Sequence, residues 1–179
     1  MQMIRRRGGD GPLRRDDGGT QYQMRQRLAS IGDDFFIEDN HGRRAFHVDG
    51  KALRVRDTLF FKDMQGNELY KIQEKMARVR DSMNIYKGDD VAASVHKAMI
   101  TPLRERWTVN VHGGEDLSIQ GNILDHEYTF ERGRQKVAEV SKRWFRVRDT
   151  YGVEIDAGED DALILACTIV VDQMAHQGR

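Results

Sequence analysis

ALILACTIVV, residues 162–171, is the longest apolar run in the chain and the stretch that decides its fold. Only Thr168 interrupts it, and a helix that is apolar on every side must be buried on every side. The acidic triplet 159–161 directly precedes the run, and a helix N-terminus favours negative charge. The β-branched residues would also suit a central strand, but period-two alternation is absent. The pattern and the length therefore predict a buried C-terminal helix.

Upstream of this run the sequence alternates between short strand-like segments and turns. In Phe46-His47-Val48 and Trp107-Thr108-Val109 the outer residues are apolar and the middle one is polar, as in a strand with one buried face. Glycine with Asp or Asn marks the turns, because glycine adopts positive φ and Asx side chains bond their own backbone. The clearest turns are 39–42, 63–67, 87–90, 112–115 and 131–134.

Counting both arms of each hairpin gives about a dozen strands. The most apolar segment of a chain made of half-buried strands belongs inside the barrel that they form. We therefore predict a mainly β fold, an antiparallel closed barrel of about twelve strands around a central hydrophobic C-terminal α-helix. Such a barrel leaves little room for an internal ligand.

The composition of the chain limits the cellular compartment and the kinds of partner that we expect. The 29 basic and 29 acidic side chains balance, so no bulk field draws the chain to nucleic acid, and no nucleic-acid partner is expected. The single cysteine, Cys167, indicates a reducing compartment, and no apolar run follows Arg5-Arg6-Arg7 as a secretory signal would require. The run 162–171 would span roughly 15 Å as a helix, and a bilayer core needs roughly 30 Å. These features predict a soluble cytoplasmic protein without a transmembrane span.

The N-terminal twenty residues differ from the rest of the chain. Residues 1–20 are rich in Gly, Arg and Asp, with five arginines against three aspartates and almost nothing to bury. We interpret them as a disordered basic arm in front of a single domain, residues 21–179.

A short repeat stands out within that domain. Arg-Val-Arg-Asp-Thr occupies 54–58 and 146–150, and Arg-Val-Arg-Asp-Ser occupies 78–82. Asp followed by Thr or Ser suits a turn that leads into a strand, so one interpretation is a structural corner with solvated arginines. The other is a set of arginines on one rim for an anionic ligand, since phosphate needs convergent Arg or Lys donors. The candidate binding residues are Arg54, Arg56, Arg146 and Arg148.

The chain resembles the LURP-one-related family in the segments 24–28 (MRQRL), 31–35 (IGDDF) and 144–155 (WFRVRDTYGVEI), the last leading into 163–166 (LILA). The resemblance covers roughly residues 21–177. It implies a twelve-stranded barrel around a hydrophobic helix, similar to the tubby C-terminal domain and to phospholipid scramblases. Tubby domains bind phosphoinositides and scramblases act on membrane phospholipids with calcium, whereas the family itself implies no particular activity.

A search for catalytic chemistry finds little. Cys167 lies in the apolar run, where a thiolate is disfavoured. The six histidines show no metal-ligand spacing, and His112 and His126, although near acidic residues, are interpreted as solvated surface. The acids of 149–161 occupy the place of the scramblase calcium segment, but their spacing does not fit an EF-hand loop, and a strand followed by a helix N-cap explains them.

The sequence therefore favours a non-enzymatic binding or scaffold module without a cofactor or metal. Its ligand would be an anionic phospholipid headgroup or a protein partner. The alternatives are a scramblase-like, calcium-dependent protein, which would need the helix to leave the barrel, and an enzyme of unrecognised class.

Overall fold

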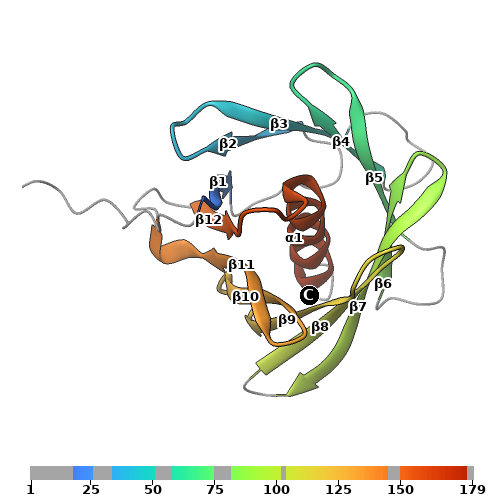
Figure 1. Ribbon diagram of the computed structural model, residues 1–179, viewed down its shortest axis with the longest axis vertical. Helices are drawn as coiled ribbons and strands as arrows, with labels where there is room; N and C mark the ends of the chain where they lie inside the picture. The colour runs from blue at the N-terminus through green and yellow to red at the C-terminus, as the bar shows by residue number, and fades with distance from the viewer. Residues whose placement is uncertain are drawn as a thin grey trace, which may run out of the picture.

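Twelve strands surround one helix in the part of the chain that the computed structural model describes, residues 18–25, 34–50, 58–74, 82–101, 104–144 and 150–176 (Figure 1). The strands are β1 (Thr20–Arg25), β2 (Phe35–Asp39), β3 (Arg44–Asp49), β4 (Thr58–Asp63), β5 (Glu68–Glu74), β6 (Ser82–Lys87), β7 (Asp90–Thr101), β8 (Arg104–Val111), β9 (Leu117–Asn122), β10 (Glu127–Arg132), β11 (Gln135–Ser141) and β12 (Thr150–Ile155). A 3-10 turn, η1 (Lys142–Trp144), follows β11, and the helix is α1 (Asp161–His176). β1 begins one residue before the predicted start of the domain.

Each strand pairs antiparallel with its sequence neighbours, and β1 pairs with β12 from Thr20↔Ile155 to Arg25↔Thr150 to close the barrel. Closure removes the exposed edges that an open sheet would present. The mainly β class and the closed barrel around a C-terminal helix are thus confirmed.

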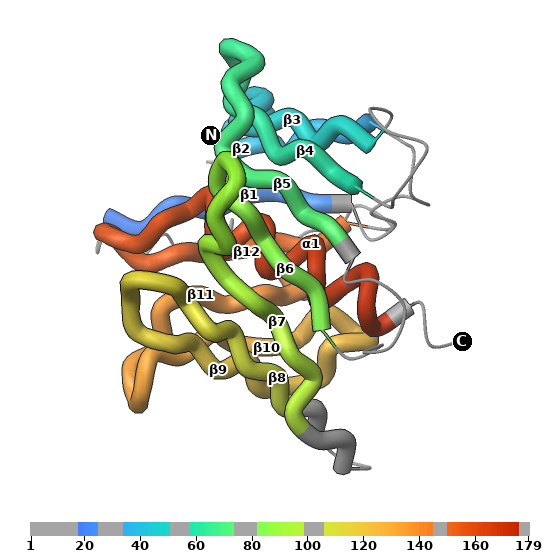
Figure 2. Tube along the Cα trace, turned by 90° about the vertical axis from the view of Figure 1, so that its right-hand side faces the viewer, coloured from blue at the N-terminus to red at the C-terminus, as the bar shows by residue number. Residues whose placement is uncertain are grey.

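The antiparallel order sorts the connections between two rims. Every odd strand starts, and every even strand ends, at one rim, which we call the hairpin rim. It comprises residues 39–44, 63–68, 87–90, 111–117, 132–135 and 155–161. The other, which we call the repeat rim, is marked by the described strand ends and connections at 25, 34–35, 49–50, 58, 74, 82, 101, 104, 122–127, 141–144 and 150. Figure 2 shows α1 running through the barrel, from the hairpin rim where β12 delivers it toward the repeat rim.

Helix α1 fills the interior. Every residue from Ile164 to Gln173 is buried, and Leu165, Ile169 and Val170 are fully inaccessible to solvent. The barrel wall meets the helix with the inward residues of each strand, and the bulkiest fully buried ones include Trp107 and Phe61. Each buried side chain of the Leu, Ile or Phe type contributes roughly 1.5–3 kcal/mol, so this core provides the main driving force for folding.

The predicted turns are confirmed by their backbone geometry. The glycine of each has positive φ, a conformation that side chains with a Cβ resist, at Gly42, Gly66, Gly88, Gly113 and Gly133. The Asp-Thr and Asp-Ser ends of the repeats do lead into strands: the buried residues Thr58, Ser82 and Thr150 begin β4, β6 and β12.

The acidic start of α1 also acts as predicted. The Asp160 side chain is the N-cap, since its Oδ1 accepts a hydrogen bond from the backbone N–H of Leu163 at 2.9 Å. The negative charge at this end of the helix is stabilised by the helix dipole.

Candidate functional site

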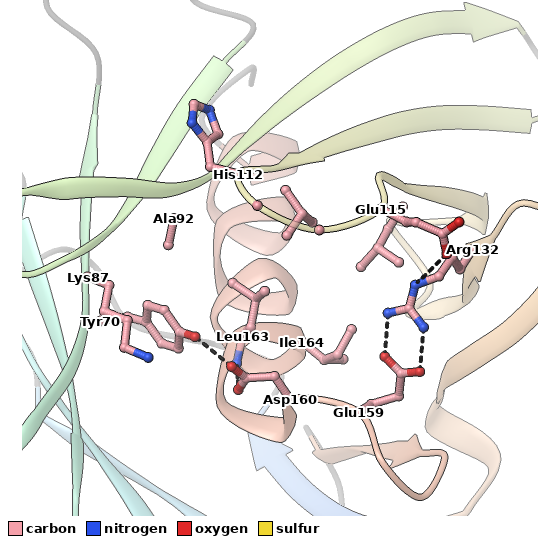
Figure 3. A pocket seen from close by; sticks show the side chains of 14 residues that line it. Tyr70, Lys87, Ala92, His112, Glu115, Arg132, Glu159, Asp160, Leu163 and Ile164 are labelled. Atoms are coloured by element: carbon pink, nitrogen blue, oxygen red, sulfur yellow. Dashed lines mark hydrogen bonds and ion pairs between the residues drawn. The ribbon is translucent and has the colours of Figure 1, made fainter.

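A pocket of about 320 Å³ opens at the hairpin rim, beside the first turn of α1 (Figure 3). Its apolar lining comes from the helix and from the ends of β7, β8 and β9. Charged and hydroxyl groups stand around it, with Tyr70 and Lys87 on one side of the helix and Glu115, Arg132 and Glu159 on the other. The apolar lining residues are Ala92, Val111, Leu117, Leu163 and Ile164.

One side of the pocket is held by Tyr70 and Asp160. The Tyr70 hydroxyl donates a hydrogen bond to Asp160 Oδ2 at 2.7 Å, and Asp160 Oδ1 caps the helix. Burial, together with the hydrogen bond to the Asp160 carboxylate, raises the pKa of Tyr70 well above its ordinary value. Tyr70 therefore remains a protonated donor, and the Asp160 carboxylate is fixed in place at the exposed mouth.

The other side is held by a bidentate ion pair. Arg132 Nη1 and Nη2 donate to Glu159 Oε1 and Oε2 at 2.7 and 2.6 Å, and Arg132 Nε lies 3.7 Å from the carboxylate of the exposed Glu115. The hydrogen bonds to Glu159 raise the pKa of Arg132. This pair ties β10 to the loop before α1. With Lys87 and Asp160, the pocket has two cations and three carboxylates, so it does not concentrate positive charge for an anion.

The acidic triplet before the helix distributes its carboxylates among three partners. Glu159 binds Arg132, Asp160 binds Tyr70, and Asp161 Oδ2 accepts a hydrogen bond from Tyr22 at 2.6 Å. These contacts anchor the start of α1 to β10, β5 and β1. No three His, Cys, Asp or Glu side chains are grouped to hold a metal ion within the described ranges.

A second polar cluster lies inside the barrel near the repeat rim. His126 Nε2 and Asp172 Oδ1 are 2.7 Å apart, and the two side chains are 0% and 4% exposed. The His126 ring stacks on Tyr151 with 4.3 Å between ring centroids. The interpretation of His126 as solvated surface is therefore wrong, because Asp172 meets it from α1, 46 residues later. The available signal in the sequence was Asp172, an acid that follows an otherwise apolar run and therefore needs a buried polar partner. His112, in contrast, is exposed as predicted.

The four candidate arginines, Arg54, Arg56, Arg146 and Arg148, lie outside the described residues. The strands that they precede are placed, and both β4 and β12 begin at the repeat rim. The strand of the third copy, β6, begins there too. The topology thus brings the starts of the strands that follow the three repeats to one end of the barrel, which the sequence could not establish.

The hairpin rim is strongly acidic. Counting Lys and Arg against Asp and Glu, its described segments hold five cations and eleven acids, a net charge of −6. The sequence segments 25–35, 49–58, 74–82, 101–104, 122–127 and 141–150, which connect strands at the other rim, hold thirteen cations and nine acids, a net charge of +4, but nine of these cations lie outside the described residues.

No helix within the described ranges is long and apolar enough to cross a bilayer.

Comparison with known proteins supports one family. A sequence model described as LURP-one-related matches residues 20–172, most of the chain. A crystal structure of an Arabidopsis thaliana protein has the same fold, with a TM-score of 0.68 and 15% sequence identity over 89% of this chain and 93% of that one. No curated protein sequence matches. On the strength of the family match, this chain belongs to the LURP-one-related family.

Proposed function

We propose that this chain is a non-enzymatic, cytoplasmic binding module that recognises anionic phospholipid headgroups through its repeat rim. The observation that carries the proposal is that α1 fills the barrel, so a ligand must be met at a rim or on the outer wall. Of these surfaces, the repeat rim is the one at which the strands that follow the three Arg-Val-Arg repeats begin.

Covalent geometry keeps the candidate arginines near that rim. Arg56 and Arg148 stand two residues before Thr58 and Thr150, which begin β4 and β12. Two residues of fully extended chain span at most about 7 Å. Arg54 and Arg146 stand two residues further out, within about 14 Å of the strand starts by the same estimate. This supports the assignment of Arg54, Arg56, Arg146 and Arg148 as headgroup-binding residues.

Charge polarity supports one orientation. An anionic leaflet attracts basic residues by about 1 kcal/mol each near its surface. It would draw in the end of the barrel whose connecting sequence segments carry a net charge of +4 and repel the hairpin rim with its net charge of −6. The barrel axis would then be perpendicular to the membrane surface, and the pocket would face away from the lipid.

The turn η1 at the repeat rim has the composition of a membrane-contacting turn, and its Arg143 lies 3.3 Å from the Glu127 carboxylate. η1 is Lys142-Arg143-Trp144, directly before the segment of the last repeat, and its Arg143 side chain is 81% exposed. Trp is favoured at membrane interfaces because it combines an apolar body with a polar N–H. Glu127 holds this turn, since its carboxylate accepts hydrogen bonds from the Ser141 hydroxyl at 2.9 Å and the Lys142 N–H at 3.1 Å.

The absence of enzymatic activity in this proposal rests on access. Burial raises the pKa of the Cys167 thiol far above its ordinary value and seals it from solvent. The His126–Asp172 pair is also sealed inside the barrel. Neither the nucleophile nor this possible acid–base pair can reach a substrate without opening the barrel.

The test is co-sedimentation of the full chain with vesicles of phosphatidylcholine containing phosphatidylserine, at low and high salt. Exposed charge contacts are screened over roughly 10 Å at 0.1 M salt, so we expect binding at low salt that falls steeply as salt rises. Arg146→Glu/Arg148→Glu should abolish it.

The matched control is Arg43→Glu/Arg134→Glu, which makes the same change in net charge at exposed positions of the hairpin rim. It should bind vesicles as the unmodified chain does. If both variants lost vesicle binding equally, net charge and not the Arg-Val-Arg repeat would explain the binding. No binding at low salt would remove the lipid proposal and leave a protein partner as the ligand of this module.

A further inference from the structure

The hairpin rim has a feature that the proposed function does not use: its pocket combines an aliphatic part with charged side chains, and it lies amid excess negative charge. Leu163, Ile164 and Val111 present aliphatic surface to the pocket, and the surrounding rim carries a net charge of −6. Several of the carboxylates project into solvent, including those of Asp89, Asp90 and Glu115.

This combination specifies a ligand chemistry. The aliphatic part of the lining favours an apolar group, because contact removes both surfaces from water. A rim of like charges is relieved by cations around that group. The carboxylates are spread over five segments of the rim, further than one small molecule extends, whereas the pocket holds roughly one large side chain or a small ligand.

We propose that the hairpin rim docks a basic peptide segment of a partner protein. One apolar side chain of the segment enters the pocket, and flanking Lys or Arg side chains face the rim carboxylates. The site lies at the opposite end of the barrel from the repeat rim, so it does not depend on lipid binding and can be occupied at the same time.

The walls of the pocket are held in place before any peptide binds. The Tyr70–Asp160 hydrogen bond and the Arg132–Glu159 ion pair hold its two sides, so binding of a peptide needs to order few further side chains of the pocket. Lys87 is the exposed cation of the lining and opposes a basic ligand. We therefore expect the substitution Lys87→Glu to tighten binding of the basic peptide.

The test uses two fluorescent peptides, Arg-Arg-Leu-Arg-Arg and Arg-Arg-Gly-Arg-Arg, both with blocked ends, and measures fluorescence anisotropy with the full chain at low salt. Both carry the same charge, so their difference isolates the apolar contact. We expect the leucine peptide to bind roughly tenfold more tightly, since a buried leucine side chain gains most of its transfer free energy. Ala92→Leu, which fills the pocket from β7, should remove this difference.

Charge variants test the rim. Asp89→Lys/Glu115→Lys should weaken the leucine peptide by about fivefold, as expected for exposed charge pairs, and Lys87→Glu should strengthen it severalfold. The control Asp34→Lys/Asp125→Lys makes the same change in net charge at exposed positions of the repeat rim and should bind as the unmodified chain does. A melting curve for each variant verifies that it is folded.

Equal binding of the leucine and glycine peptides would overturn the pocket assignment. Equal weakening by the rim and control variants would overturn the rim assignment, because bulk charge would then explain the binding. Neither result bears on the vesicle experiment, whose variants lie in the Arg-Val-Arg repeat, so the two proposals fail separately.

Discussion

His126 is held in a conformation that its residue type disfavours. Among the described non-glycine residues it is the one with positive φ, at 53°, and its side chain is fully buried against Asp172 and Tyr151. Such backbone strain costs of order 1–3 kcal/mol and persists only where surrounding contacts over-determine it. The contacts with Asp172 of α1 and with Tyr151 hold the His126 ring, and hydrogen bonds between Asn122 and Asp125 hold the turn itself.

The His126–Asp172 pair should therefore be strongly coupled. We expect Asp172→Ala to lower the free energy of unfolding by roughly 3 kcal/mol, because it removes the buried carboxylate that lies 2.7 Å from His126 Nε2. In a double-mutant cycle with His126→Ala, measured by urea unfolding, the coupling energy should be about 1–3 kcal/mol. Strictly additive effects would contradict this account of the pair.

Gly121 is needed for a close approach between β9 and β10. A Cβ built on it would lie 2.4 Å from the Glu127 carbonyl oxygen and 2.6 Å from Tyr128 Cα, both backbone atoms, and its φ is 143°. We expect Gly121→Ala to destabilise the fold by more than about 2 kcal/mol. Gly66→Ala is the control, since it has positive φ but open space around it, and should cost about 1 kcal/mol. Thermal melting of both variants compares them, and similar losses would show that backbone conformation alone matters.

At the scale of elements, α1 is both the core of the barrel and the connection between its rims. Asp160 and Asp161 fasten its start to Tyr70 and Tyr22 on the wall, and Asp172 fastens its second half to His126. These polar contacts toward both ends fix the position of α1 along the barrel axis, because its apolar surface alone would not specify that position.

The buried helix makes a direct chemical prediction. Cys167 is fully buried and its pKa is raised by that burial, so little thiolate is present and reagents cannot reach it. Native protein should resist a thiol reagent that reacts promptly after denaturation. Rapid labelling of the folded chain would mean that α1 leaves the barrel readily, as a scramblase-like protein would require.

A charge in the same helix should be fatal to folding. Leu165 is fully buried, and an unpaired buried carboxylate costs several kcal/mol, a large part of the stability of a domain of this size. We expect Leu165→Asp to accumulate in the insoluble fraction on expression. The conservative Leu165→Met should stay folded, because it preserves volume and polarity.

At the scale of the whole molecule, closure of the barrel sets what can be removed from the N-terminus. β1 pairs with both β12 and β2, so its loss would open the barrel. Residues 1–17 precede it and contain little to bury. We expect deletion of 1–17 to leave the melting temperature unchanged, and deletion of 1–25 to prevent folding. A large loss of stability in the shorter deletion would show that the basic arm packs on the domain.

Much of this fold is predictable because its signals are local. The period-two segments around Val48 and Val109, the glycine turns and the apolar run of 162–171 each report on neighbours in the sequence, and together they predict a closed barrel around a helix. The N-cap role of the acidic triplet is predictable for the same reason. His126 shows the limit, since an adjacent Glu127 suggests surface, while the partner that buries it is far along the chain.

The sequence by itself determined the elements, their order and the family, since hydrophobic period, turn chemistry and motif order are properties of contiguous residues. Only the tertiary structure decided which contacts join distant segments: Tyr22 meets Asp161 across 139 residues, and Arg132 meets Glu159 from another strand. It also decided the acidity of the hairpin rim. Strands that alternate in direction send every second connection to that end of the barrel, and these connections together hold eleven acids and five cations.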